Sequence, residues 1–272
     1  MRIVVLLSRM ESAREVIGVA ARKAERLKAG VTLLYVREEK LFELPIFSDA
    51  EPSLEGIRER LEELILGVRQ EGDAWALLVY DNDPVDHLLL EAEREKAALL
   101  ITDLSGEART ELIGGVRTSL LLLEAGRRHD CEKGLAVFDP AATGSECLAT
   151  LRRVLGARAW SAYMDYQVIP SIGTDLSLDP MVDTLNIDVE LEQKLMEGRK
   201  KAFLELCEKE GINGIFEVGE AGLVEDILVR ADLEEAECLG VIVEDHETLL
   251  AEGLGELSQR VHRDLMICFR QA

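Results

Sequence analysis

The chain has 272 residues, a net charge of −22 at pH 7 and 47% hydrophobic residues. A chain of this length is long enough for two domains with their own hydrophobic cores. The excess of acidic residues argues against binding to nucleic acid phosphates or anionic membranes, and no apolar run approaches the roughly 20 residues of a membrane span. We therefore expect neither a nucleic acid partner nor a membrane partner.

Strands and helices are expected to alternate along the first half of the chain. Apolar runs and helical spacing predict strands at 3–7, 31–36, 75–80 and 97–102, and helices at about 12–28, 53–70 and 84–95. The third helix should begin at Asp83-Pro84, because proline is favoured in a first turn. A glycine-bearing loop then leads to an apolar helix that includes 119–125. On this interpretation the first half has no closing strand.

Two long connections interrupt this alternation at equivalent points. Residues 37–54 combine charges, two prolines and an apolar cluster, and residues 164–186 are rich in Pro, Gly, Asp and Ser. The apolar cluster of the first connection consists of Leu41, Phe42, Leu44, Ile46 and Phe47. Connections of this length are uncommon in compact domains and often carry function.

A second series of strands and helices starts near Gly134. It predicts a helix at about 188–210, a strand near 214–218, a helix–strand unit ending at Asp245, a helix at 256–263 and a closing strand at 265–269. Alternation of this kind predicts an α/β fold with parallel sheets and helices on both faces.

The two series look like one domain written twice. Val85, Leu88, Leu89 and Ala92 recur as Val224, Ile227, Leu228 and Ala231 at one constant offset. The spacing is that of one helix face, and each helix leads into an apolar run. Further matches place 3–8 against 134–139 and Leu27, Ala29 and Tyr35 against Leu155, Ala157 and Tyr163.

The five cysteines are scattered and never in CxxC spacing. They are typical of reduced, mostly buried thiols in a cytoplasmic protein. The four histidines show no triad or metal spacing, and His246 beside Glu244 and Asp245 is better explained as part of an acidic loop. No catalytic residue and no metal ligand is therefore expected.

This order of elements resembles the universal stress protein family in its tandem form. The segment GELSQRVHRDLMICF is similar to the family's closing helix and strand. The resemblance implies two three-layer α/β/α domains with parallel sheets, residues 1–130 and 131–272. In family members that bind ATP, the ends of the first two strands hold adenosine, and a loop of pattern G-x2-G-x9-G-[ST] before the last helix holds the phosphates.

The resemblance places possible nucleotide ligands, and many of them depart from the pattern. In half one they are Ser8, Val36, Thr102, Ser105, Gly106, Gly115, Arg117, Thr118 and Ser119. In half two they are Asp139 and Gly255, with Glu256 where a hydroxyl should meet phosphate. A phosphate cradle needs small residues whose backbone N–H groups can close on the anion, and a glutamate repels it.

Three functions remain open from these residues. The first is a non-catalytic binding and regulatory module of the stress response with degenerate nucleotide sites and no certain cofactor. The second is a member that binds ATP or AMP in half one, with at most slow ATPase activity. The third is an unrelated α/β enzyme with the same layers.

The apolar connection and the missing strand of half one also bear on assembly. An open sheet edge is usually covered or paired, and exposed apolar patches mark interfaces. We expect an intrachain pseudo-dimer or a homodimer that uses Leu41, Phe42, Ile46 and Phe47, or the open edge beside them.

Overall fold

The structure is a computed structural model that describes residues 1–37, 53–70, 72–127, 129–140, 145–167, 183–219, 222–244 and 249–269. Half one contains β1 (Arg2–Leu7), α1 (Ala13–Leu27), β2 (Gly30–Arg37), α2 (Leu54–Val68), β3 (Trp75–Asp81), α3 (Pro84–Arg94), β4 (Leu99–Thr102), α4 (Gly106–Gly115) and β5 (Ser119–Leu122). Half two contains β6 (Lys133–Val137), α5 (Ser145–Leu155), β7 (Ala159–Tyr166), α6 (Asp183–Glu210), β8 (Asn213–Val218), α7 (Leu223–Leu233), β9 (Cys238–Val243), α8 (Leu249–Arg260) and β10 (Asp264–Phe269).

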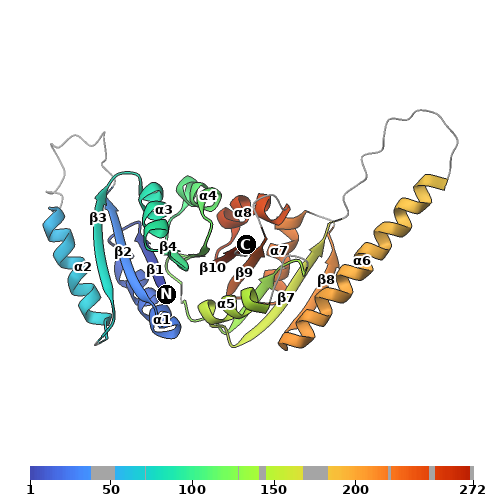
Figure 1. Cartoon of the computed structure of the whole chain (residues 1–272), viewed down its shortest axis with the longest axis horizontal. Coiled ribbons are helices and arrows are strands. Elements are labelled where there is room, and N and C mark those ends of the chain that lie inside the picture. The colour runs from blue at the N-terminus through green and yellow to red at the C-terminus, as the bar shows by residue number, and fades with distance from the viewer. Residues whose placement is uncertain are drawn as a thin grey trace.

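The ten strands of the described residues form one continuous sheet in the order β3-β2-β1-β4-β5-β10-β9-β6-β7-β8 (Figure 1). The strands are parallel within each half, as the alternation of strands and helices predicted. The halves join where β5 pairs with β10 in antiparallel fashion, with Leu120 opposite Ile267. From the junction outward, the strand order is β5-β4-β1-β2-β3 in half one and β10-β9-β6-β7-β8 in half two. Equivalent strands therefore occupy equivalent places in the two halves.

The prediction of a helix at 119–125 is wrong. Residues 119–122 form β5, so half one does have a closing strand, and the helix of this region is α4. Leu120, Leu121 and Leu122 are buried because helices cover both faces of the sheet and strands flank both edges of β5. A short apolar run cannot be assigned to helix or strand by periodicity, which explains the error. The predicted helix at 256–263 likewise spans 249–260.

The internal repeat has a structural counterpart in the backbone. Val85 and Leu88 of α3 and Val224 and Ile227 of α7 all face the core. The turn after each helix holds a non-glycine residue with positive φ, Lys96 at 49° and Glu235 at 51°.

One repeat pair predicted from the sequence is wrong by a residue. The sheet register places Val31 beside Ile3 and Trp160 beside Gly134, so Leu34 rather than Tyr35 corresponds to Tyr163. The turn before β7 is one residue longer than the turn before β2, which accounts for the shift.

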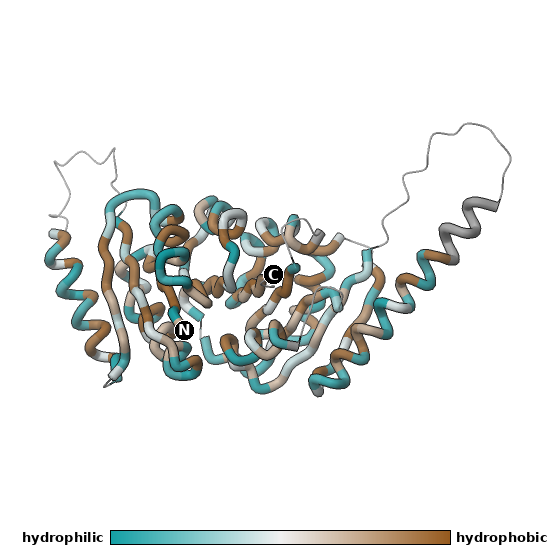
Figure 2. The backbone as a smooth tube through the Cα atoms, viewed as in Figure 1, coloured by the Kyte–Doolittle hydropathy of each residue, from teal (hydrophilic) through white to brown (hydrophobic). Residues whose placement is uncertain are grey.

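Helices cover both faces of the sheet and divide the core into two layers. One layer packs α1, α2, α5 and α6 against the strands, and the other packs α3, α4, α7 and α8. Hydrophobic colour follows the central strands, whereas each helix alternates between the two colours (Figure 2). This is the pattern expected of strands buried on both faces and of amphipathic helices.

Polar side chains reinforce the junction between the halves. Arg109 of α4, which is 7% exposed, donates to the carbonyls of Leu104 (2.6 Å), Ser258 (2.9 Å) and Leu123 (3.4 Å). The buried His129 contacts Asp264 through Nδ1 (2.8 Å) and Glu15 through Nε2 (2.9 Å). Burial lowers the pKa of His129, but the two carboxylates outweigh it and raise the pKa.

Several sequence predictions lie outside the described residues. They concern the apolar cluster Leu41–Phe47, the second long connection at 168–182, and Asp245 and His246. In the part of the chain that the structure describes, no helix is long and apolar enough to cross a membrane.

Candidate functional site

The carboxyl end of the parallel strands is where α/β sheets bind ligands. In half one this edge centres on Asp103, which directly follows β4 and is 3% exposed. Its carboxylate accepts the Ser8 backbone N–H (2.9 Å) and the Ser12 hydroxyl. The acid at this edge is thus supplied by the fourth strand. The signal for it in the sequence was an aspartate directly after a buried strand.

Val36 lies at the carboxyl end of β2, on the same edge of the sheet. It is 3% exposed and lies opposite Tyr80 of β3. The Tyr80 ring stacks on His87 at 4.2 Å, and its hydroxyl donates to the buried Glu91 at 2.9 Å. Burial raises the pKa of Tyr80, as does its hydrogen bond to Glu91. We call Val36, Tyr80, His87 and Glu91 the half-one corner.

The equivalent corner of half two has different chemistry. Sheet register and the repeat offset place Asp165, Glu217, Asp226 and Arg230 at the positions of Val36, Tyr80, His87 and Glu91. Arg230 forms an ion pair with Glu217, and its guanidinium carbon lies 5.8 Å from the centre of the Tyr163 ring. We call these four residues the half-two corner.

The half-two corner holds three carboxyl groups against one cation. Burial, and after it the charges of Asp226 and Glu217, raise the pKa of Asp165 to about 6, although a hydrogen bond from Gln167 opposes the rise. A Cβ atom at Gly219 would lie 2.6 Å from an Asp165 carboxylate oxygen, so the chain passes close to this group. The arrangement disfavours an anionic ligand at the end of β7.

Thr102, Ser105 and Gly106 lie with Ser8 and Val36 at the carboxyl edge of half one. The Thr102 hydroxyl accepts the Leu104 backbone N–H at 3.1 Å. Ser105 precedes α4 in extended conformation, and Gly106 starts the helix with φ of +62°. The structure therefore groups these five predicted residues at one edge.

Four other predicted residues lie at the end of α4 and the start of β5, away from that edge. A Cβ on Gly115 would lie 2.7 Å from Leu89, so this glycine permits close packing of α4 on α3. Arg117 donates to the Gly114 and Val116 carbonyls. The Thr118 hydroxyl donates to the Ala97 carbonyl at 3.0 Å, and Ser119 begins β5. The structure does not bring them together with Ser8 and Val36.

The two residues predicted in half two are also separated. Asp139 follows β6 and forms an ion pair with Arg199 at 3.1 Å. Gly255 lies within α8, where a Cβ atom would be 3.3 Å from Thr110 of α4. Glu256 forms an ion pair with Arg260 at 2.8 Å. Gly255 thus serves the packing of α8 on α4 at the junction.

Comparison with known proteins assigns the first half of the chain. Residues 1–121 match the model of the universal stress protein family. A search of curated proteins found no match.

Solved structures share the fold of nearly the whole chain. A functionally unknown protein from Pseudomonas aeruginosa PAO1 is 14% identical with a TM-score of 0.64, and the match covers 98% of this chain and 92% of that one. A universal stress protein from Archaeoglobus fulgidus DSM 4304 is also 14% identical, with a TM-score of 0.58 and coverage of 98% and 96%. Residues 1–121 are therefore similar to the universal stress protein family, and nearly the whole chain shares the fold of these solved structures.

Proposed function

We propose that the protein is a tandem universal stress protein that acts as a non-catalytic binding and regulatory module of the stress response, with degenerate nucleotide sites in both halves. In this proposal residues 1–130 and 131–272 are its two domains, and it works in the cytoplasm. The proposal rests mainly on the connections that lead to the last strand of each half.

The connection between β4 and β5 is too short for the family's phosphate loop and helix together. The pattern G-x2-G-x9-G-[ST] takes fifteen positions and is followed by a helix. Residues 103–118 are all that separates β4 from β5, and α4 occupies most of them. In half two, residues 244–263 separate β9 from β10, and α8 occupies 249–260. A helix occupies most of each connection, so too few residues remain for a phosphate loop of fifteen positions.

The charge distribution in half two supports the same conclusion. The half-two corner places Asp165, Glu217 and Asp226 around the end of the second strand, where family members hold adenosine. Glu256 adds another carboxylate on α8. A nucleotide in half two would bring its phosphate charges towards these carboxylates.

A specific observation favours the alternative, ATP or AMP binding in half one. The half-one corner presents Val36 beside the Tyr80–His87 stack, an apolar and aromatic environment suited to a purine base. Ser8, Ser105 and Gly106 lie at the same edge, where hydroxyl and N–H groups can meet phosphate. This alternative predicts one nucleotide per chain, held without the family's phosphate loop.

Titration calorimetry of the full chain with ATP and with AMP, each with Mg²⁺, separates the two functions. The leading proposal predicts no saturable heat up to about 1 mM nucleotide. Saturable binding of one nucleotide per chain would instead establish the alternative. Two sites per chain would contradict both, because the half-two corner is acidic.

We also propose that two chains associate as a homodimer. The edge that the sequence predicted to be open is instead closed by β5, which pairs with β10. The apolar sequence cluster Leu41–Phe47 is the remaining basis. Replacing Phe42 and Phe47 with serine should lower the sedimentation coefficient at micromolar concentration, and an unchanged value would exclude this interface.

A further inference from the structure

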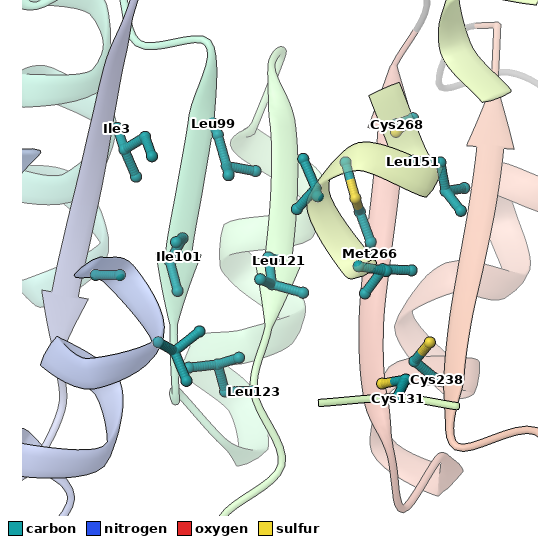
Figure 3. Close-up of a cluster of buried hydrophobic side chains, with 14 of the residues drawn as sticks. Ile3, Leu99, Ile101, Leu121, Leu123, Cys131, Leu151, Cys238, Met266 and Cys268 are labelled. Carbon is teal, nitrogen blue, oxygen red and sulfur yellow. The ribbon is translucent and has the colours of Figure 1, made fainter. Parts of the chain in front are cut away.

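Cys131 and Cys238 lie together although 106 residues separate them in the sequence. Cys131 precedes β6, Cys238 begins β9, and these strands are neighbours with Gly134 opposite Cys238. Both side chains belong to the same core layer, and they are drawn next to each other near the start of β9 (Figure 3). The Cys238 thiol donates a hydrogen bond to the carbonyl of Lys133, two residues after Cys131, at 3.9 Å. The pair therefore consists of two reduced thiols that lie side by side in the core.

The surroundings distinguish the two sulfurs. The neighbouring Cys238 thiol and the buried Lys23 lower the pKa of Cys131, against burial and the charges of Asp264 and Glu237. The neighbouring Cys131 and burial raise the pKa of Cys238. Lys23 comes from α1 in half one and donates to the Leu155 carbonyl at 3.2 Å. Cys131 is also the more exposed of the two side chains, and the Cys238 thiol donates its proton to the Lys133 carbonyl, so we assign Cys131 as the nucleophile and Cys238 as the protonated thiol.

We propose that Cys131 and Cys238 form an oxidation site that a small peroxide converts to a disulfide. The Cys131 thiolate attacks one peroxide oxygen, the O–O bond breaks, and protonation of the other oxygen releases water and leaves a sulfenic acid. The Cys238 sulfur then attacks the Cys131 sulfur, the S–O bond breaks, and the departing hydroxide takes the Cys238 proton as a second water. Two thiols lose two electrons and two protons, and one hydrogen peroxide becomes two waters.

Burial restricts which oxidants can reach this pair. Cys131 is 5% exposed and Cys238 is 0% exposed. A peroxide is close to water in size, whereas a disulfide such as oxidised glutathione must align a bulky S–S bond with the attacking sulfur. The pair is therefore expected to react with hydrogen peroxide and to resist oxidised glutathione.

The test uses the full chain, hydrogen peroxide and peptide mass spectrometry. After oxidation, remaining thiols are alkylated under denaturing conditions and the protein is digested with trypsin. The expected product joins HDCEK (129–133) to the peptide 231–260, is two hydrogens lighter than the two peptides with free thiols, and disappears on reduction. Oxidised glutathione at the same concentration should yield at least about tenfold less.

Matched variants control for the other thiols. Cys131→Ala and Cys238→Ala should each abolish the cross-link, whereas Cys147→Ala should leave its yield unchanged although Cys147 is the more exposed thiol. Circular dichroism checks that each variant is folded, and the cross-link in the unmodified chain does not depend on any variant. A main cross-link between Cys147 and Cys268, or oxidation to sulfinic acid without a cross-link, would overturn the proposal.

Lys23 provides a second readout through the rate. Lys23→Met keeps the length of the buried side chain and removes its charge, so less thiolate forms at Cys131. Cross-linking at pH 7 should slow by about three- to tenfold, because a higher pKa leaves less Cys131 thiolate, and should recover at higher pH. An unchanged rate would show that Lys23 does not assist the reaction.

Discussion

The half-one and half-two corners occupy equivalent positions of one repeated scaffold and differ at every residue. Val36, Tyr80, His87 and Glu91 in half one correspond to Asp165, Glu217, Asp226 and Arg230 in half two. In half one a tyrosine donates to a buried glutamate, and in half two an arginine pairs with a glutamate at the same two positions.

The difference shows which parts of the repeat are fixed by packing and which are free to change chemistry. The core positions of α3 and α7 keep apolar residues, and the turns that follow keep a left-handed backbone conformation at the equivalent positions Lys96 and Glu235. Val36 and Glu91 are buried and the other residues of the two corners are half-buried, and these positions carry an aromatic pair in one half and acidic groups in the other without a change of fold. This is why the fold and the site must be argued separately.

The largest effect is expected when the acid of half two is transferred to half one. Val36→Asp would place a carboxylate at a buried position opposite Tyr80 and should reduce the free energy of unfolding by about 3 to 4 kcal/mol at pH 7. Urea unfolding measures it. Val36→Thr, similar in size and uncharged, should cost about 1 kcal/mol. Equal losses in the two variants would mean that charge is not what separates the corners.

The next effect concerns an asymmetry at the junction. Val116 and Val261 end their helices with hydrogen bonds to Leu112 and Leu257, so Arg109 in α4 corresponds to Leu254 in α8. Arg109→Met should cost about 2 to 3 kcal/mol in urea unfolding, because three buried carbonyls lose their charged donor. Arg117→Met, which removes contacts within its own helix end, should change stability by less than about 0.5 kcal/mol. A cost for Arg109→Met as small as this control would show that Leu254 and Arg109 are interchangeable.

Whether a feature of the fold or of the site could be predicted depends on how far apart its contacting residues lie in the sequence. The alternation, the repeat and the parallel sheets could be predicted because they rest on local periodicity and one constant offset. β5 could not, since Leu120–Leu122 is covered on all sides by elements that the run itself does not reveal. Arg109 and Asp103 likewise acquire their roles from carbonyls, hydroxyls and N–H groups distant in the sequence.

The glycine and hydroxyl positions of the family pattern illustrate a different limit. Gly115, Thr118 and Gly255 are the residue types that a phosphate loop uses, and the structure employs them in helix packing and in a turn. A residue type is therefore compatible with several roles, and we use the lengths of the connections between β4 and β5 and between β9 and β10 to distinguish them. The number of residues in the connection between β4 and β5 could be counted in the sequence. Only the bounds of α4 and β5 show that the helix occupies most of it.

A smaller effect should follow from replacing Asp165, the residue of the half-two corner whose pKa is raised. The pKa of Asp165 is raised from 3.8 to about 6, so the folded state binds this proton more tightly than the unfolded state. Stability contributed by this group is complete below about pH 4 and is lost as the pH rises to about 6. Asp165→Asn should remove this slope and, allowing for partial solvent screening, stabilise the protein by about 1 kcal/mol at pH 7.5.

The control for this experiment is Asp130→Asn, whose carboxylate is 76% exposed. It should leave the pH dependence of unfolding unchanged. If Asp165→Asn also leaves the pH dependence of unfolding unchanged, the half-two corner does not disfavour the charged form of Asp165.

The smallest effect concerns the hydroxyl that the sequence suggested as a phosphate ligand. Thr118→Val loses the hydrogen bond to the Ala97 carbonyl and should cost about 0.5 kcal/mol in urea unfolding. In half two the Arg263 guanidinium serves the equivalent Ala236 carbonyl at 2.7 Å. A variant of unchanged stability would argue against this structural role and return Thr118 to the list of possible ligands.

Native mass spectrometry of the full chain tests the central claim most directly, namely that helices α4 and α8 have taken the length that a phosphate loop would need. The protein is measured as purified and again after addition of ATP with Mg²⁺. The account predicts the mass of the polypeptide, as monomer or homodimer, with no adenine nucleotide retained in either sample. A stoichiometric ATP or AMP adduct that survives purification would contradict it.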